Sequence, residues 1–255
     1  IDVSATGRGD GGLAVVWSDQ RTVFNGSILA HAGASGGDGG QVETSGKESL
    51  VVGRGKVDAY AARGAMGHWL LDPRDINVVA NGTGDTANLN QVNDFTDGGI
   101  GTDTALEVSA LDGAAAAVTL QASRDINVQV DVNMAKTLTA QAGRDINIDA
   151  GVTLFSTKTI TLSAGDASAP SPDPVGKINV NGTLQSDSNL LRSAPGGFNV
   201  AATGTVNATN LTVTTNDADV TATGNLLIAN NASFSVGTGN VSLTSTANNF
   251  VNTVS

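Results

Sequence analysis

The sequence predicts an all-β protein, a right-handed parallel β-helix in which short strands stack coil upon coil. Aromatic residues make up only 4% of the chain and charged residues only 15%, and small and β-branched residues dominate. Short segments alternate strictly between aliphatic and polar residues, and similar segments recur along the chain. One such repeat is too small to bury its own apolar face, so successive repeats must stack into a common core. Crossovers between parallel strands are nearly always right-handed, which sets the expected hand of the coil.

The first repeat is marked by a glycine-rich turn. The sequence Gly-Asp-Gly-Gly occurs at 9–12 and again at 37–40, and the residues that follow each copy also correspond. Glycine tolerates positive φ and aspartate accepts hydrogen bonds from nearby backbone N–H groups, so both suit a tight turn. Each copy therefore begins a double-length repeat of strands and turns.

A tripeptide that many cell-surface receptors bind lies at the first of these turns. Arg8, Gly9 and Asp10 are the candidate ligand-binding residues of the chain. The second copy of the turn has Gly36 where the first has an arginine, which favours a structural role for the glycine and aspartate. We interpret the tripeptide as a turn and keep receptor binding as the alternative hypothesis.

The alternating pattern stops between 81 and 113, which predicts an insertion outside the coil. Within this stretch Thr104 and Glu107 have the spacing of a helix capping box, and Gly113 suits the position just after a helix. We expect a short helix near 104–112, lying against the coil.

The clearest repeat is in the middle of the chain, where "SRDINVQVDVN" at 123–133 matches "GRDINIDAGVT" at 143–153. In strands of this kind alternate residues face the core, and the others face outward. Equivalent outward residues on successive coils then form columns that can bond to one another. One predicted column consists of Asn127, Asn147, Asn179 and Asn199, and another of Thr119, Thr139 and Thr161.

The C-terminal part of the chain continues the same pattern with almost no charge. A proline-rich stretch at 166–176 predicts a loop leaving the coil. No lysine or arginine follows Arg192, yet the alternation persists. We therefore expect one β-helix segment over 1–255.

Composition excludes several classes of function. The net charge of -11 opposes binding to nucleic acid or to anionic membranes. No apolar run reaches the roughly 18 residues of a membrane span. Cysteine is absent, and neither histidine, His31 or His68, has the spacing of a metal ligand. We expect no cofactor and no metal.

Carboxylate pairs are the remaining candidates for catalysis, as in enzymes that hydrolyse polysaccharides. The candidate pairs are Asp72 with Asp75, Asp131 with Asp149, and Asp217 with Asp219. We interpret them as solvated surface, and the repeated Arg-Asp at 124–125 and 144–145 as surface ion pairs. The chain is therefore not expected to be an enzyme.

Two motifs resemble a known family. They are "GGQVETSG" at 39–46 and "WLLDPRDI" at 69–76, followed downstream by "ALEVSALDGAAAAVTLQASRDINV" at 105–128. Together with the rest of 9–78 they closely resemble the filamentous-haemagglutinin-like exoproteins of two-partner secretion systems. The resemblance is strong over about 9–150 and generic beyond it.

The resemblance implies a piece of a large exoprotein, secreted to the outer surface of a Gram-negative bacterium by a dedicated outer-membrane β-barrel partner. Members of the family act as adhesins, haemagglutinins, biofilm matrix proteins or effector carriers, and their motifs here carry no catalytic residues. We expect a structural and adhesive rod segment that binds a host receptor or polysaccharide, or presents a distal binding region. The alternatives are a carbohydrate-active β-helix module that binds or hydrolyses polysaccharide, and a fibre that assembles end to end through unpaired strand edges.

Overall fold

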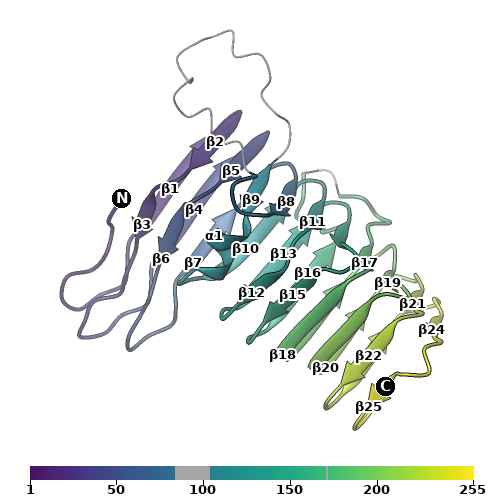
Figure 1. Cartoon of the computed structure of the whole chain (residues 1–255). Coiled ribbons are helices and arrows are strands. Elements are labelled where there is room, and N and C mark those ends of the chain that lie inside the picture. Colours follow the sequence, from purple (N-terminus) through teal and green to yellow (C-terminus); the bar gives the residue numbers. More distant parts are fainter. Residues whose placement is uncertain (84–103, 171) are drawn as a thin grey trace. The chain divides into compact units, whose positions relative to one another are not determined.

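The computed structural model describes residues 1–83, 104–170 and 172–255. They form two compact units, unit 1 (Ile1–Gln121) and unit 2 (Ala122–Ser255). Within each unit short strands stack in parallel register, coil upon coil (Figure 1). The predicted all-β parallel β-helix is confirmed. Continuity of the two units as one segment stays a prediction.

Unit 1 is built from three parallel sheets. The first contains β1 (Leu13–Ser18), β4 (Gln41–Gly46), β7 (His68–Leu71) and β10 (Ala117–Ala122) in that order. The second runs in the order β2 (Arg21–Phe24), β5 (Ser49–Val52), β9 (Ala105–Glu107) and β8 (Ile76–Val79). The third pairs β3 (Ser27–Leu29) with β6 (Lys56–Asp58).

One aromatic pair lies in the otherwise mainly aliphatic apolar core of unit 1. Trp69 is completely buried, and its ring meets that of Phe24 edge to face with centroids 6.4 Å apart. Its indole N–H donates to Thr44 Oγ1 at 2.9 Å, so the one polar atom of the ring has a partner inside the core. Burial of a ring of this size stabilises the coils that it joins.

The predicted helix is present but begins later than expected. Helix α1 spans Val108–Asp112, and Gly113 follows it as the C-cap. Ala105–Glu107 instead forms β9, which pairs with both β5 and β8. Glu107 occupies the N-cap without a side-chain cap, and Thr104 Oγ1 accepts the backbone N–H of Leu50 at 3.2 Å. The expected capping box is therefore wrong, because pairing between two strands outweighs the local helix signal. Most of the predicted 81–113 insertion lies outside the described residues.

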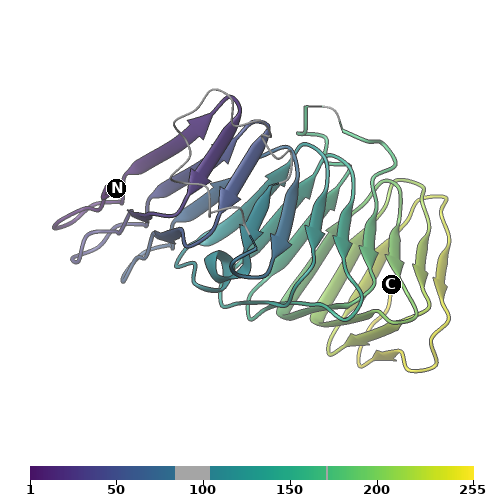
Figure 2. The same ribbon diagram turned by 45° about the horizontal axis from the view of Figure 1, so that its top comes forward.

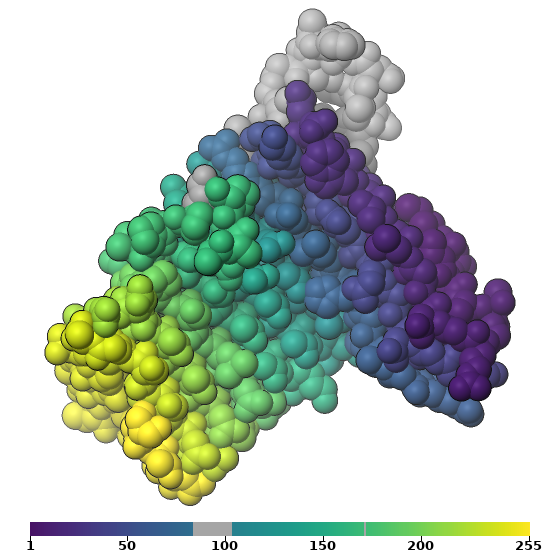
Figure 3. All heavy atoms as spheres, turned by 180° about the vertical axis from the view of Figure 1, so that it is seen from behind, coloured from purple at the N-terminus to yellow at the C-terminus, as the bar shows by residue number. Residues whose placement is uncertain are grey.

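Unit 2 contains two parallel sheets and successive coils that lie as adjoining bands (Figure 3). The first sheet contains β12 (Val132–Met134), β13 (Leu138–Ala142), β15 (Thr153–Ser156), β16 (Ile160–Ala164), β18 (Thr183–Ser193), β20 (Thr205–Thr214), β22 (Asn225–Ile228), β23 (Ala232–Ser235) and β25 (Asn249–Phe250). The second runs in the order β11 (Ile126–Val128), β14 (Ile146–Ile148), β17 (Ile178–Val180), β19 (Phe198–Val200), β21 (Val220–Ala222) and β24 (Val241–Leu243).

In unit 2, the segments that connect the strands lie beside the equivalent segments of the neighbouring coils (Figure 2). The described residues of 166–176 contain no strand and connect β16 to β17, and a loop that leaves the coil there stays a prediction. None of the helices in the described part of the chain has the length and apolarity needed to cross a membrane.

One cation is buried in unit 2, where most of the other buried residues are apolar. Arg192 on β18 is only 3% exposed, and its strand neighbours in register are Leu162 and Val213. Its Nη1 donates to the carbonyl of Leu191, its guanidinium lies 6.0 Å from the ring centroid of Phe198, and its Nε and Nη2 have no hydrogen-bond partner. Desolvation lowers the pKa of Arg192 to about 9.

Candidate functional site

The Arg8-Gly9-Asp10 tripeptide lies in a turn that stacks on the next coil. The carboxylate Oδ1 of Asp10 accepts the backbone N–H of Asp38 at 2.8 Å, and Oδ1 of Asp38 in turn accepts the N–H of Ala65 at 2.7 Å. Gly9 has a φ of 143°, in the region that favours glycine. Arg8 and Asp10 are both exposed. The geometry gives Asp10 a structural role, and receptor binding by Arg8, Gly9 and Asp10 stays a prediction.

The backbone of this turn is packed too closely for larger residues. The N–H of Gly9 donates to the carbonyl of Gly36 at 2.9 Å. A Cβ placed on Gly37 would lie 2.0 Å from the carbonyl oxygen of Gly9. The repeated glycines are therefore explained by close contact between successive turns.

Aspartates at the coil corners of unit 2 have the same role as Asp10. Each uses Oδ1 to accept a backbone N–H of the following coil. The pairs are Asp125 with Asp145 (3.2 Å), Asp131 with Thr153 (2.7 Å), Asp145 with Lys177 (2.7 Å), Asp217 with Thr238 (2.7 Å) and Asp219 with Asn240 (2.7 Å). Corner carboxylates thus satisfy backbone donors that the strands leave unpaired.

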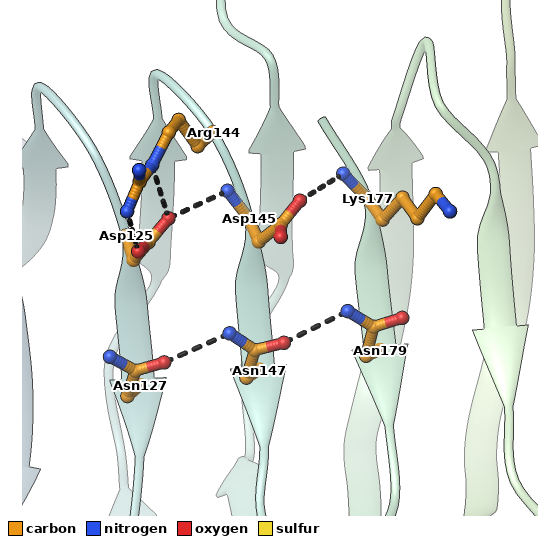
Figure 4. A network of polar contacts seen from close by, with 7 residues as sticks. All are labelled: Asp125, Asn127, Arg144, Asp145, Asn147, Lys177 and Asn179. Carbon is orange, nitrogen blue, oxygen red and sulfur yellow. Dashed lines mark hydrogen bonds and ion pairs between the residues drawn. The ribbon is translucent and has the colours of Figure 1, made fainter. Parts of the chain in front are cut away.

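The predicted asparagine column forms the first asparagine ladder, in which each amide Nδ2 donates to Oδ1 of the asparagine one coil earlier. The distances are 2.9 Å from Asn147 to Asn127, 2.9 Å from Asn179 to Asn147 and 3.1 Å from Asn199 to Asn179. Figure 4 shows the first three members beside the corner aspartates. The prediction of this column is confirmed.

The expected surface ion pairing is present beside this ladder. Arg144 forms a two-pronged ion pair with Asp125, in which its Nε donates to Oδ1 at 3.0 Å and its Nη2 contacts Oδ2 (Figure 4). Asp125 therefore binds both the side chain and the backbone of the next coil.

A second asparagine ladder was not predicted from the sequence. It joins Asn210 to Asn189 at 3.0 Å, Asn230 to Asn210 at 2.9 Å and Asn252 to Asn230 at 2.5 Å. Its members recur every 20 to 22 residues, which is the signal that could have identified it.

Two of the three threonines in the predicted threonine column are shown to be neighbours. Thr139 and Thr161 are adjacent in register within unit 2. Thr119 lies in unit 1, where its Oγ1 is 2.9 Å from Nε2 of His68. Partial burial lowers the pKa of His68.

The three predicted aspartate pairs have different surroundings. Asp131, Asp217 and Asp219 are corner aspartates, as described above. Asp75 is buried, so its interpretation as solvated surface is wrong, whereas Asp149 is exposed, as is Asp72, which directly follows β7. Burial and, secondarily, the negative charge of Glu43 raise the pKa of Asp72. The carboxylate that acts on Asp72 is thus Glu43, which the sequence analysis did not consider because it is distant in sequence.

The outer face around Asp72 combines an indole with these two carboxylates. Trp17 on β1 is in register with Ser45 on β4, and Oγ of Ser45 accepts the backbone N–H of Asp72 at 3.1 Å. Val15 is in register with Glu43, one position along the same face. We call the surface formed by Trp17, Glu43 and Asp72 the Trp17 face.

Histidines and acidic residues do not assemble a metal centre in the described residues, where no group of three or more potential ligands occurs. His31 contacts Asp58 instead, with 3.0 Å between Nε2 and Oδ1. Comparison of the chain with models of protein families and with curated proteins gives no match.

Proposed function

We propose that the chain is a structural and adhesive rod segment of a secreted bacterial surface adhesin of the filamentous-haemagglutinin type. It mediates attachment to cells or matrix, or holds a distal binding region away from the cell. The proposal rests on the resemblance of 9–78 and 105–128 to that family and on the parallel β-helix, which suits an elongated structural element.

The observation that carries the proposal is that polar side chains form hydrogen bonds between successive coils. Asp10, Asp38 and the corner aspartates of unit 2 bond to the backbone of the following coil, and the two asparagine ladders bond side chain to side chain. Because the same contacts recur from coil to coil, they favour a structural role for the coil. We propose no catalytic activity.

The same proposal includes the route to the cell surface. An outer-membrane secretion partner would export the parent protein, which would fold outside the cell. The absence of cysteine suits passage of an unfolded chain, because no disulfide-closed loop can form.

Attachment under flow tests the proposal. Beads coated with the purified chain should adhere to host cells or to a polysaccharide matrix more than beads coated with a Val180→Asp variant, whose buried charge disrupts a coil. Equal attachment of the two bead types would contradict an adhesive role for the folded rod.

A further inference from the structure

A strip of exposed apolar side chains lies on the first strand of unit 1. Leu13, Val15 and Trp17 are all exposed on β1, with 52% of Trp17 accessible. Their neighbours in register on β4 are polar, namely Gln41, Glu43 and Ser45. Ser45 is completely buried and its Oγ accepts the backbone N–H of Asp72, so the polar groups that border the apolar strip at the surface are Gln41 and Glu43.

Two carboxylates lie close together beside the exposed indole. Glu43 is one strand away from Trp17, and Asp72 follows β7, two strands away. With strands spaced about 4.8 Å apart, the indole and the two carboxylates extend over about 10 Å of the sheet face. No cation forms an ion pair with Glu43 or Asp72 among the described residues, although Arg74 pairs nearby with Glu48 at 3.6 Å.

The raised pKa of Asp72 supports the closeness of the pair, because the charge of Glu43 contributes to it. A face of this kind offers one flat aromatic ring and several hydrogen-bond acceptors. Pyranose rings present apolar C–H faces to an aromatic ring and donate hydroxyl hydrogen bonds to carboxylates at their edges. The carboxylates repel ligands that carry acidic groups.

We propose that the Trp17 face binds a saccharide chain without acidic groups, stacking one pyranose ring on Trp17 and accepting hydroxyl or ammonium hydrogen bonds at Glu43 and Asp72. A sheet face is flat, so it suits an extended polymer better than a small enclosed molecule. This inference deepens the adhesive function proposed above, on which it rests, by assigning its ligand class.

The two tryptophans make the site directly observable. Trp17 is half exposed, whereas Trp69 is fully buried, so acrylamide should quench the fluorescence of Trp17 alone. The probes are a neutral glucose hexamer, a hexamer of protonated glucosamine and an alginate hexamer, followed by an array of glycans. Binding of either non-acidic hexamer, or of non-acidic glycans on the array, should protect Trp17 from acrylamide and shift its emission to the blue.

Substitutions then locate the site. Trp17→Ala should weaken saccharide binding by about tenfold or more, and Glu43→Gln or Asp72→Asn by several-fold. Tyr60→Ala is the matched control, because Tyr60 is an equally exposed aromatic residue outside the Trp17 face and should leave binding unchanged. Circular dichroism of each variant verifies that the coil is intact.

The alternative outcomes separate the two proposals. The saccharide site would be overturned if no non-acidic glycan bound, or if the chain preferred the alginate hexamer. It would also be overturned if the Trp17→Ala variant bound the non-acidic saccharide as tightly as the wild type. A concentration-dependent dimer that Trp17→Ala abolishes would likewise overturn it, and would assign the face to a second copy of the chain. Saccharide binding without attachment of coated beads would contradict the adhesive function alone, and attachment unaffected by Trp17→Ala would contradict the saccharide site alone.

Discussion

Asp10 and Asp38 occupy equivalent positions in successive turns, and the carboxylate of the first accepts the backbone N–H of the second at 2.8 Å. Because Asp38 repeats the same bond with Ala65, the turn is specified by its relation to the next coil as much as by its own sequence.

Removing the first of these acceptors should destabilise unit 1. Asp10→Ala leaves the N–H of Asp38 to water and should lower the free energy of unfolding by about 1 kcal/mol. Asp10→Asn keeps a side-chain oxygen and should cost less. Urea denaturation of both variants measures the difference. Equal stability of the wild type and Asp10→Ala, together with loss of receptor binding, would instead support a ligand role for Arg8, Gly9 and Asp10.

Alanine substitutions in the first asparagine ladder should lower the stability most at its middle members. Asn147 both donates and accepts within the ladder, so Asn147→Ala should cost about 1 to 2 kcal/mol, more than Asn199→Ala at the last described bond. The double variant of Asn147 and Asn179 should lose less than the two single costs added together, because both remove the bond that joins them. Additive losses would argue against a connected ladder.

Replacing the buried arginine of unit 2 should stabilise the protein. Arg192→Met removes an incompletely bonded cation from an apolar core and should raise the free energy of unfolding at pH 7 by about 1 to 4 kcal/mol. Thermal denaturation compares the two proteins. A less stable Arg192→Met would show that the guanidinium contributes more through its contacts with Phe198 and Leu191 than it loses by desolvation.

The stability difference between the wild type and Arg192→Met should change with pH in a defined direction. The folded-state pKa of Arg192 is lowered to about 9, well below that of an exposed arginine, so the unfolded chain binds more protons than the folded chain above about pH 9. Wild-type stability should therefore rise relative to Arg192→Met as the pH increases above about 9, and the difference should be constant below it. A difference that does not change up to pH 11 would contradict the shift.

Asp72 should make the stability of the protein fall, not rise, with increasing pH, and should do so in the acidic range. Its pKa is raised above 3.8 in the folded state, so the folded protein binds more protons just above that pH and loses stability as the pH rises through the folded pKa. Asp72→Asn should remove this loss and be the more stable protein at pH 7, with the advantage vanishing below about pH 3.8. Melting temperatures between pH 3 and 7 measure it, and Glu43→Gln should reduce the effect.

Periodicity was sufficient to predict the coil, its inward faces and the Asn127 column, because each depends on residues that recur at regular intervals. The bounds of α1 were not predictable, since β9 forms only when β5 and β8 are both available to pair with it. The placement of Trp17, Glu43 and Asp72 near one another depends on the register of β1, β4 and β7, which come from different coils, and local sequence does not contain that register.

The asparagine ladder also indicates how this fold can change over time. Asn127 and Asn147 are 20 residues apart and Asn147 and Asn179 are 32 apart, yet both bonds measure 2.9 Å. The described residues of 166–176 lie within the longer interval, and the strands before and after them, β16 and β17, keep parallel register with β13 and β14. Insertions at such corners are therefore structurally inexpensive, and a lineage or a protein engineer could graft new loops there while every coil keeps its neighbours.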